Sequence, residues 1–135
     1  MGKGIALQFR ERFPQNYLAY KKACEMEQVQ TGKMFVFKEQ TMQGEKVIIN
    51  FPTKKHWRHK SQYSYIEAGL QDLVKVLLQE QIVSVALPPL GCGNGGLEWP
   101  KVKQMIKKHL SPLKQVEILV YEPNDQVKAL LQKEQ

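Results

Sequence analysis

The amino-acid sequence predicts an α/β fold with a mixed central sheet. Three observations support this class: strand-like and helix-like segments alternate in the second half of the chain, a hairpin-like pair of strands lies in the first half, and a glycine-rich loop joins a strand to a helix. Helical crossovers make neighbouring strands parallel, whereas a hairpin makes them antiparallel. The sheet is therefore expected to contain both kinds of pairing.

The first half of the chain is expected to hold two helices and two strands. Apolar residues at helical spacing predict a helix over 5–13, and Pro14 ends it and opens a second helix over 15–27, on which Cys24 is a small half-buried residue. Short apolar runs predict strands over 34–37 and 46–51, joined by a turn at 43–45. A polar, basic loop follows the second strand.

The second half is expected to alternate between helices and strands. An apolar stripe predicts a long helix over 64–81, and a β-branched run predicts a buried strand over 82–87. The remaining segments predict a helix over 100–110, a strand over 116–121 and a short last helix from Asn124 or Asp125 to about Gln132. This order places a strand-to-helix loop at residues 88–99.

Size and charge limit the class of protein. The chain has 135 residues, 42% of them hydrophobic, which suits one domain with a core. No apolar run approaches the ~20 residues of a membrane span, and no secretory signal follows Met1, so a cytoplasmic protein is expected. The two cysteines form no zinc-like spacing or disulfide framework. The net charge of +7 favours polyanionic partners or, equally, a solvated basic surface.

The loop PPLGCGNGGLEW, residues 88–99, holds four of the nine glycines within six residues. Ligands of α/β proteins bind beyond the carboxyl ends of strands, where this loop is expected to lie. Glycine lets a ligand approach backbone N–H groups closely, so the loop predicts a cradle for a diphosphate. Its spacing matches neither the dinucleotide fingerprint nor the P-loop motif, and a tight turn required only by packing is the alternative.

Two further segments are expected near this loop. Gly2-Lys3-Gly4 runs straight into a helix, so its amides could face the same phosphates. Residues 50–58 leave the end of a strand and carry two aromatic side chains, one hydroxyl and four potential cations. This segment is either a basic surface loop or a catalytic lysine flanked by groups that hold a phosphate or a base.

Together these segments resemble the macrodomain family, in the branch of DNA ADP-ribosyl glycohydrolase antitoxins and terminal ADP-ribose protein glycohydrolases. The resemblance rests on MGKGIALQF (1–9), PQNYLAYKKAC (14–24), GKMFVF (32–37), INFPTKKHWRHKS (49–61), IEAGLQDL (66–73) and PPLGCGNGGLEW (88–99). It implies a three-layer α/β/α fold that binds ADP-ribose without a metal or cofactor. The implied ligand-binding residues are Gly2, Lys3, Gly4, Ile5, Thr53, Leu90, Gly91, Cys92, Gly93, Asn94 and Gly95.

The antitoxin side of the branch looks closer, because of the HWR and NGGLEW segments. This implies a glycohydrolase that removes ADP-ribose from a thymine base in single-stranded DNA, with Lys54 as the catalytic residue and a cognate ADP-ribosyltransferase toxin as a partner. Lys54 would act as a nucleophile or electrostatically. The alternatives are an ADP-ribose reader without catalysis, a protein-directed ADP-ribosyl hydrolase, and a nucleic-acid-binding module that uses the 54–60 cations with Trp57.

Two departures from the family are expected to matter. Protein-directed relatives carry an aspartate at the position of Gly95, so its absence favours the DNA activity, and Glu98 is expected only to cap a helix. The chain also starts at the GKG loop, where macrodomains usually have two preceding strands. Missing strands would leave unpaired backbone groups, so we expect a marginally stable fold or dimerisation through an open edge.

Overall fold

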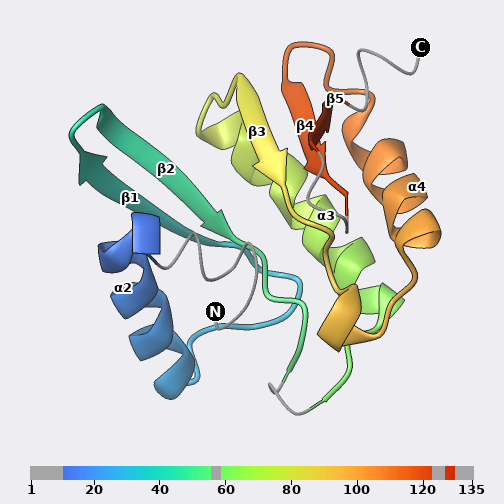
Figure 1. Cartoon of the computed structure of the whole chain (residues 1–135), viewed down its shortest axis with the longest axis horizontal. Helices are drawn as coiled ribbons and strands as arrows, with labels where there is room; N and C mark the ends of the chain where they lie inside the picture. Colours follow the sequence, from blue (N-terminus) through green and yellow to red (C-terminus); the bar gives the residue numbers. More distant parts are fainter. Residues whose placement is uncertain (1–10, 56–58, 123–126, 130–135) are drawn as a thin grey trace.

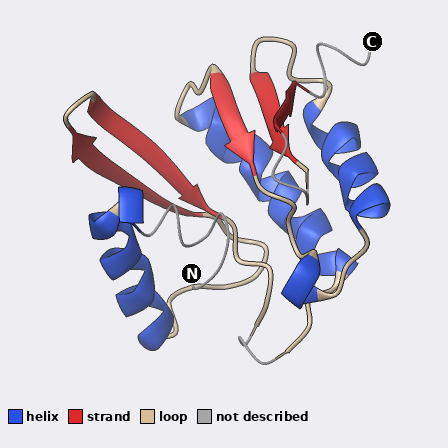
Figure 2. Ribbon diagram, viewed as in Figure 1, coloured by secondary structure: helices blue, strands red, loops and turns tan. Residues whose placement is uncertain are grey.

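The computed structural model describes residues 11–55, 59–122 and 127–129, and the chain is α/β as predicted (Figure 1, Figure 2). Most elements lie within a few residues of their predicted bounds. The described elements are helices α2 (Pro14–Glu25), α3 (Tyr63–Gln79) and α4 (Trp99–Leu110), the 3₁₀ helix η1 (Gly93–Gly95), and strands β1 (Phe35–Thr41), β2 (Gly44–Asn50), β3 (Ser84–Leu87), β4 (Glu117–Tyr121) and β5 (Val127–Ala129).

The hairpin of β1 and β2 is longer than the apolar pattern predicts. Its antiparallel register runs from Phe35 opposite Asn50 to Thr41 opposite Gly44, so the turn comes one residue earlier than expected. The Thr41 hydroxyl donates to the Gly44 carbonyl at 2.7 Å and accepts from the Gln43 N–H at 3.1 Å. Gly44 has φ +104°, a conformation that favours glycine.

Three buried polar side chains fasten α2 to this hairpin. The Asn16 N–H, in the first turn of α2, donates to the Glu39 carboxylate of β1 at 2.8 Å. This bond satisfies one of the backbone donors that a helix start leaves open. The side-chain amides of Asn16 and Asn50 also donate to each other, at 3.2 and 2.8 Å. The end of β2 is therefore held by buried hydrogen bonds.

A second sheet contains β3, β4 and β5, so the described strands form two sheets rather than the single mixed sheet that the sequence predicts. The strands β3 and β4 are parallel, with Ser84 opposite Glu117, and β5 is antiparallel to β4, with Ala129 opposite Leu119. The predicted last helix is therefore wrong over 127–129. These residues pair with the edge of β4, whose backbone groups would lack partners if the segment formed a separate helix. Residues 123–126 and 130–135 lie outside the described ranges.

The main core lies between the second sheet and helices α3 and α4. Figure 1 shows α3 behind β3 and β4, with α4 beside it. The apolar stripes that predict these helices provide its buried faces. The members with almost no exposed surface are Ile66, Leu70, Leu73, Leu77, Val102, Ile106, Leu110, Ile118 and Val120. None of the described helices is both long and apolar enough to span a bilayer.

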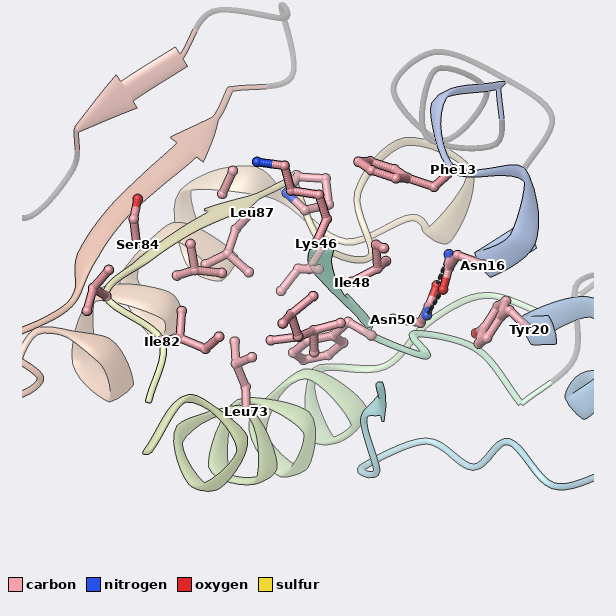
Figure 3. A pocket seen from close by; sticks show the side chains of 18 of the residues that line it. Phe13, Asn16, Tyr20, Lys46, Ile48, Asn50, Leu73, Ile82, Ser84 and Leu87 are labelled. Carbon is pink, nitrogen blue, oxygen red and sulfur yellow. Dashed lines mark hydrogen bonds between the residues drawn. The ribbon is translucent and has the colours of Figure 1, made fainter. Parts of the chain in front are cut away.

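A cavity of about 860 Å³ separates the two sheets. Within the described residues, β2 pairs only with β1 and β3 only with β4, so each leaves one edge without a strand partner. Apolar side chains such as Ile48, Leu73 and Leu87 line the space between them (Figure 3). Thr53 and Leu90 also line it, so the cavity reaches the carboxyl ends of both strands.

Candidate functional site

The candidate site is built from the two loops that follow β2 and β3. Residues 51–55 continue from the end of β2, and the glycine loop follows β3 and contains η1. A backbone hydrogen bond joins the two loops, because the Ser61 N–H donates to the Gly95 carbonyl at 2.9 Å. Two of the three segments that the sequence singles out therefore meet at one rim of the protein.

The glycine loop makes most of its backbone hydrogen bonds internally. The N–H groups of Cys92, Gly95 and Leu97 donate to the carbonyls of residues 89, 92 and 91, at 3.2, 3.4 and 3.0 Å. The N–H groups of Leu90, Gly91, Gly93 and Asn94 have no acceptor among the described residues. These four amides are therefore the ones that the loop can offer to an anion.

Positive φ angles give the glycine loop its shape. Gly91 has φ +72° and Gly93 has φ +69°, both in the left-handed region. A β-carbon on Gly91 would also lie 2.7 Å from a methyl carbon of Leu97 and 3.1 Å from the Ser61 hydroxyl oxygen. Glycine at position 91 is thus required by both conformation and packing.

Lys54 lies against the glycine loop. Its side chain is half-buried, and its Cε atom is 3.9 Å from the place that a β-carbon on Gly95 would occupy. The preceding residue, Thr53, is held through its carbonyl, which accepts a hydrogen bond from the Ser61 hydroxyl. The structure therefore brings the predicted catalytic lysine and the predicted diphosphate loop together.

Other cations surround the loop beside aromatic rings. The Lys55 ammonium lies 5.6 Å from the centre of the Tyr65 ring, and the Lys101 ammonium lies 4.1 Å from the centre of the Tyr63 ring. Such contacts are attractive, because the face of an aromatic ring carries partial negative charge. The Lys60 Cδ atom lies 3.1 Å from the β-carbon position of Gly96. We refer to Lys55, Lys60, Tyr63, Tyr65 and Lys101 as the basic rim.

The remaining predicted site residues have different surroundings. The Leu90 side chain is buried in the main core, so only its backbone could contact a ligand. Burial raises the pKa of the Cys92 thiol, whose sulfur donates weakly to the Leu90 carbonyl at 3.6 Å. This thiol therefore stays protonated at neutral pH and is a poor nucleophile. Gly2, Lys3, Gly4 and Ile5 lie outside the described residues, as does the side chain of Asn94.

Two expectations for helical residues are wrong. Glu98 precedes α4, but its side chain makes no capping hydrogen bond. Instead its backbone N–H donates to the Tyr63 hydroxyl at 3.1 Å, because the start of α3 lies beside it. Cys24 is exposed rather than half-buried, since the buried residues of α2 are Asn16 and Ala23.

Ser61 is a buried residue at the centre of the site that the sequence analysis does not identify. It is 6% exposed and contacts both loops through its N–H and its hydroxyl. Its position in a basic, polar loop gives no periodic or spacing signal. Within the described residues, no three His, Cys, Asp or Glu side chains are grouped so that they could hold a metal ion.

Comparison with known proteins identifies the family. The family model described as Macro domain matches residues 1–106. The chain belongs to the macrodomain family. The solved macrodomain of Mycobacterium tuberculosis DarG is 52% identical and superposes with a TM-score of 0.86, covering 91% of this macrodomain and 81% of that chain. The resemblance to macrodomains and the expected fold class are thus confirmed.

The curated relatives are longer than this macrodomain. A DNA ADP-ribosyl glycohydrolase of Thermus aquaticus is 55% identical over 129 residues, which are 96% of this chain and 36% of the relative. The chain spans just over a third of the length of such relatives. The structure named Thermosipho africanus DarTG in complex with ADP-ribose is 30% identical, with a TM-score of 0.80, over 94% of this chain and 36% of that one.

Proposed function

We propose that this macrodomain binds ADP-ribose and removes it from a modified base in single-stranded DNA, with Lys54 as the catalytic residue. The observation that carries the proposal is the contact of Lys54 with the glycine loop, where its Cε atom lies 3.9 Å from the β-carbon position of Gly95. The open amides of the loop, those of Gly91, Gly93 and Asn94 among them, would hold the diphosphate beside it.

The similar proteins support this choice of substrate. The Thermus aquaticus relative, 55% identical, is named a DNA ADP-ribosyl glycohydrolase, and the Thermosipho africanus neighbour was solved with ADP-ribose. A curated relative from Thermosipho africanus, 34% identical over 138 residues, is named a fusion protein of a DNA ADP-ribosyl transferase and a DNA ADP-ribosyl glycohydrolase. We therefore infer a cognate ADP-ribosyltransferase toxin as the enzyme that makes the substrate, and a cytoplasmic location for both.

The reaction breaks the bond between the anomeric carbon of the distal ribose and the base nitrogen. Water supplies the hydroxyl group that ends on the ribose carbon and the proton that ends on the base. Lys54 can assist in two ways: its amine attacks the anomeric carbon and forms an adduct that water then cleaves, or its ammonium stabilises charge as the base departs. Both roles need the side chain to lie against the distal ribose.

The absence of a carboxylate at Gly95 favours DNA over an esterified protein as the substrate. A β-carbon at this position would lie 3.3 Å from the Ser61 β-carbon, so an aspartate here would push Ser61 by a few tenths of an ångström. The basic rim provides the second argument, because single strands bind through phosphate contacts with cations and through stacking on aromatic rings.

A release assay with a binding control tests the proposal. The wild-type chain should free ADP-ribose from ADP-ribosylated single-stranded DNA, whereas Lys54→Ala should lose release by a factor of about 100 or more. Calorimetry with free ADP-ribose should give affinities within a few-fold for both proteins. Binding without turnover by the wild type would favour the reader module instead. Full activity of Lys54→Ala would show that the catalytic assignment is wrong.

A further inference from the structure

Ser61 connects the two loops of the candidate site and lies just before helix α3. Its hydroxyl donates to the Thr53 carbonyl, and its N–H donates to the Gly95 carbonyl at 2.9 Å. Residues 63–79 then form α3, whose buried face belongs to the main core. The residue that fastens both loops is thus itself placed two positions before a rigid helix.

The surroundings of Ser61 restrict the side chain at this position. The β-carbon positions of Gly91 and Gly95 lie 3.1 Å from the Ser61 hydroxyl oxygen and 3.3 Å from its β-carbon. Two glycines of the diphosphate loop thus lie close to this serine side chain. A longer or branched residue would push one of these loops away, and a residue without a side-chain donor would release the Thr53 carbonyl.

We propose that Ser61 is a positioning residue for Lys54: its hydroxyl fixes the peptide that leads into Lys54 while its N–H fixes the loop that Lys54 faces. The proposal rests on the catalytic role of Lys54 proposed above. One small, buried residue makes both hydrogen bonds. The distance between Lys54 and the diphosphate loop therefore depends directly on Ser61. Misplacement of a reacting group by about 1 Å can reduce a rate by about 100-fold.

The expected signature is a loss of rate without a matching loss of affinity. Ser61→Ala keeps the N–H bond to Gly95, so the loop amides stay in place and ADP-ribose should bind within about threefold of wild type. The peptide before Lys54 loses its only side-chain donor among the described contacts. The single-turnover rate of ADP-ribose release should therefore fall by about 10-fold or more, by the same precision argument.

Two further variants make the test specific. Ser61→Cys keeps a weak donor at the same side-chain position and should recover part of the rate. Ser64→Ala is the matched control, because Ser64 is exposed and, within the described part of the chain, its hydroxyl contacts only Gln62, at 3.5 Å. It should leave the release rate within about twofold of wild type, as a surface change does.

The measurements are single-turnover release from ADP-ribosylated single-stranded DNA and calorimetric binding of ADP-ribose, for all variants and Lys54→Ala. A slow Ser61→Ala with near-normal affinity and partial recovery in Ser61→Cys supports the proposal. A Ser61→Ala rate within twofold of wild type overturns it, and so does an equal loss of rate and affinity. If Lys54→Ala keeps its rate, the catalytic assignment itself fails, and this outcome is independent of Ser61.

Discussion

Replacing Gly69 with alanine should destabilise the protein, although alanine is the better helix former. Gly69 is buried in α3, where the ring of Phe51 packs against its bare backbone. An alanine β-carbon would lie 2.3 Å from the Cζ atom and 2.4 Å from the Cε1 atom of that ring. Ordinary carbon contacts are about 3.5 Å, so the ring must move by roughly 1 Å.

The sign and size of the effect follow from two opposing contributions. Helix propensity favours alanine over glycine by about 1 kcal/mol. Forcing a methyl group into a filled site costs about 3 kcal/mol when the neighbour is a rigid ring. The net loss of about 2 kcal/mol should lower Tm by about 6–8 °C in a chain of this length.

Thermal unfolding followed by circular dichroism measures this loss. Gln71→Ala, at an exposed position of the same helix, is the control and should change stability by less than about 0.5 kcal/mol. Phe51→Leu should reduce the cost of Gly69→Ala by about 1 kcal/mol or more, because the two positions are in contact. A Tm that is unchanged or raised in Gly69→Ala would refute the packing argument. Because Phe51 precedes the Lys54 segment, release of ADP-ribose should also slow.

Three other predictions concern the basic rim, the open strand edges and α2. In a plot of the logarithm of the single-stranded DNA binding constant against the logarithm of the salt concentration, Lys101→Gln should make the slope shallower by about 0.7. Lys21→Gln, on α2, is the control and should leave the slope unchanged. Equal slopes for wild type and Lys101→Gln would exclude Lys101 from the interface. Sedimentation velocity should show concentration-dependent dimers that pair through the open edge of β2. Val47→Lys, at the cavity side of β2, should suppress these dimers, whereas Met42→Lys, at the exposed hairpin turn, should not. A wild-type chain that stays monomeric would contradict pairing through this edge. Desolvation raises the pKa of Tyr20, so the folded chain keeps a proton that the unfolded chain loses above pH 10. The free energy of unfolding should therefore fall as the pH rises above 10, and it should fall less steeply in Tyr20→Phe. Parallel curves of stability against pH for the two proteins would contradict this prediction.

The elements with a strong apolar period could be predicted from the sequence. The stripes of α3 and α4 became the buried faces of the main core, with Leu70 and Ile106 without exposed surface. Strand β1 was predicted too short, because its second half is polar and pairs with β2 rather than filling a core. Glu39 lies in that half, where its carboxylate satisfies the start of α2, and no local pattern reveals such a contact.

The end of the chain shows where local pattern fails. Asn124 and Asp125 are typical helix starts, yet residues 127–129 pair with β4. Residues 127–129 form a strand because the edge of β4 is available for pairing, and this edge exists only in the folded protein. The division into two sheets likewise depends on which strands find partners, and not on the strands' own sequences.

The sequence analysis predicted which two loops lie together at the site, but it missed the residues that support them. Glycines and a lysine after two strands predict a rim that holds anions, and the structure brings Lys54 to Gly95. Ser61 and Tyr63 were missed because a single hydroxyl has no spacing signature. Their roles depend on backbone atoms of Thr53, Gly95 and Glu98, which only the fold brings within reach.

A crystal structure of the chain with ADP-ribose tests the central claim most directly. The account predicts diphosphate oxygens at about 3 Å from open N–H groups of the glycine loop, those of Gly91, Gly93 and Asn94 among them. It also predicts the distal ribose against the Lys54 ammonium, with the Ser61 hydrogen bonds to Thr53 and Gly95 intact. A diphosphate bound away from the glycine loop, or a Lys54 side chain turned away from the ribose, would contradict the account.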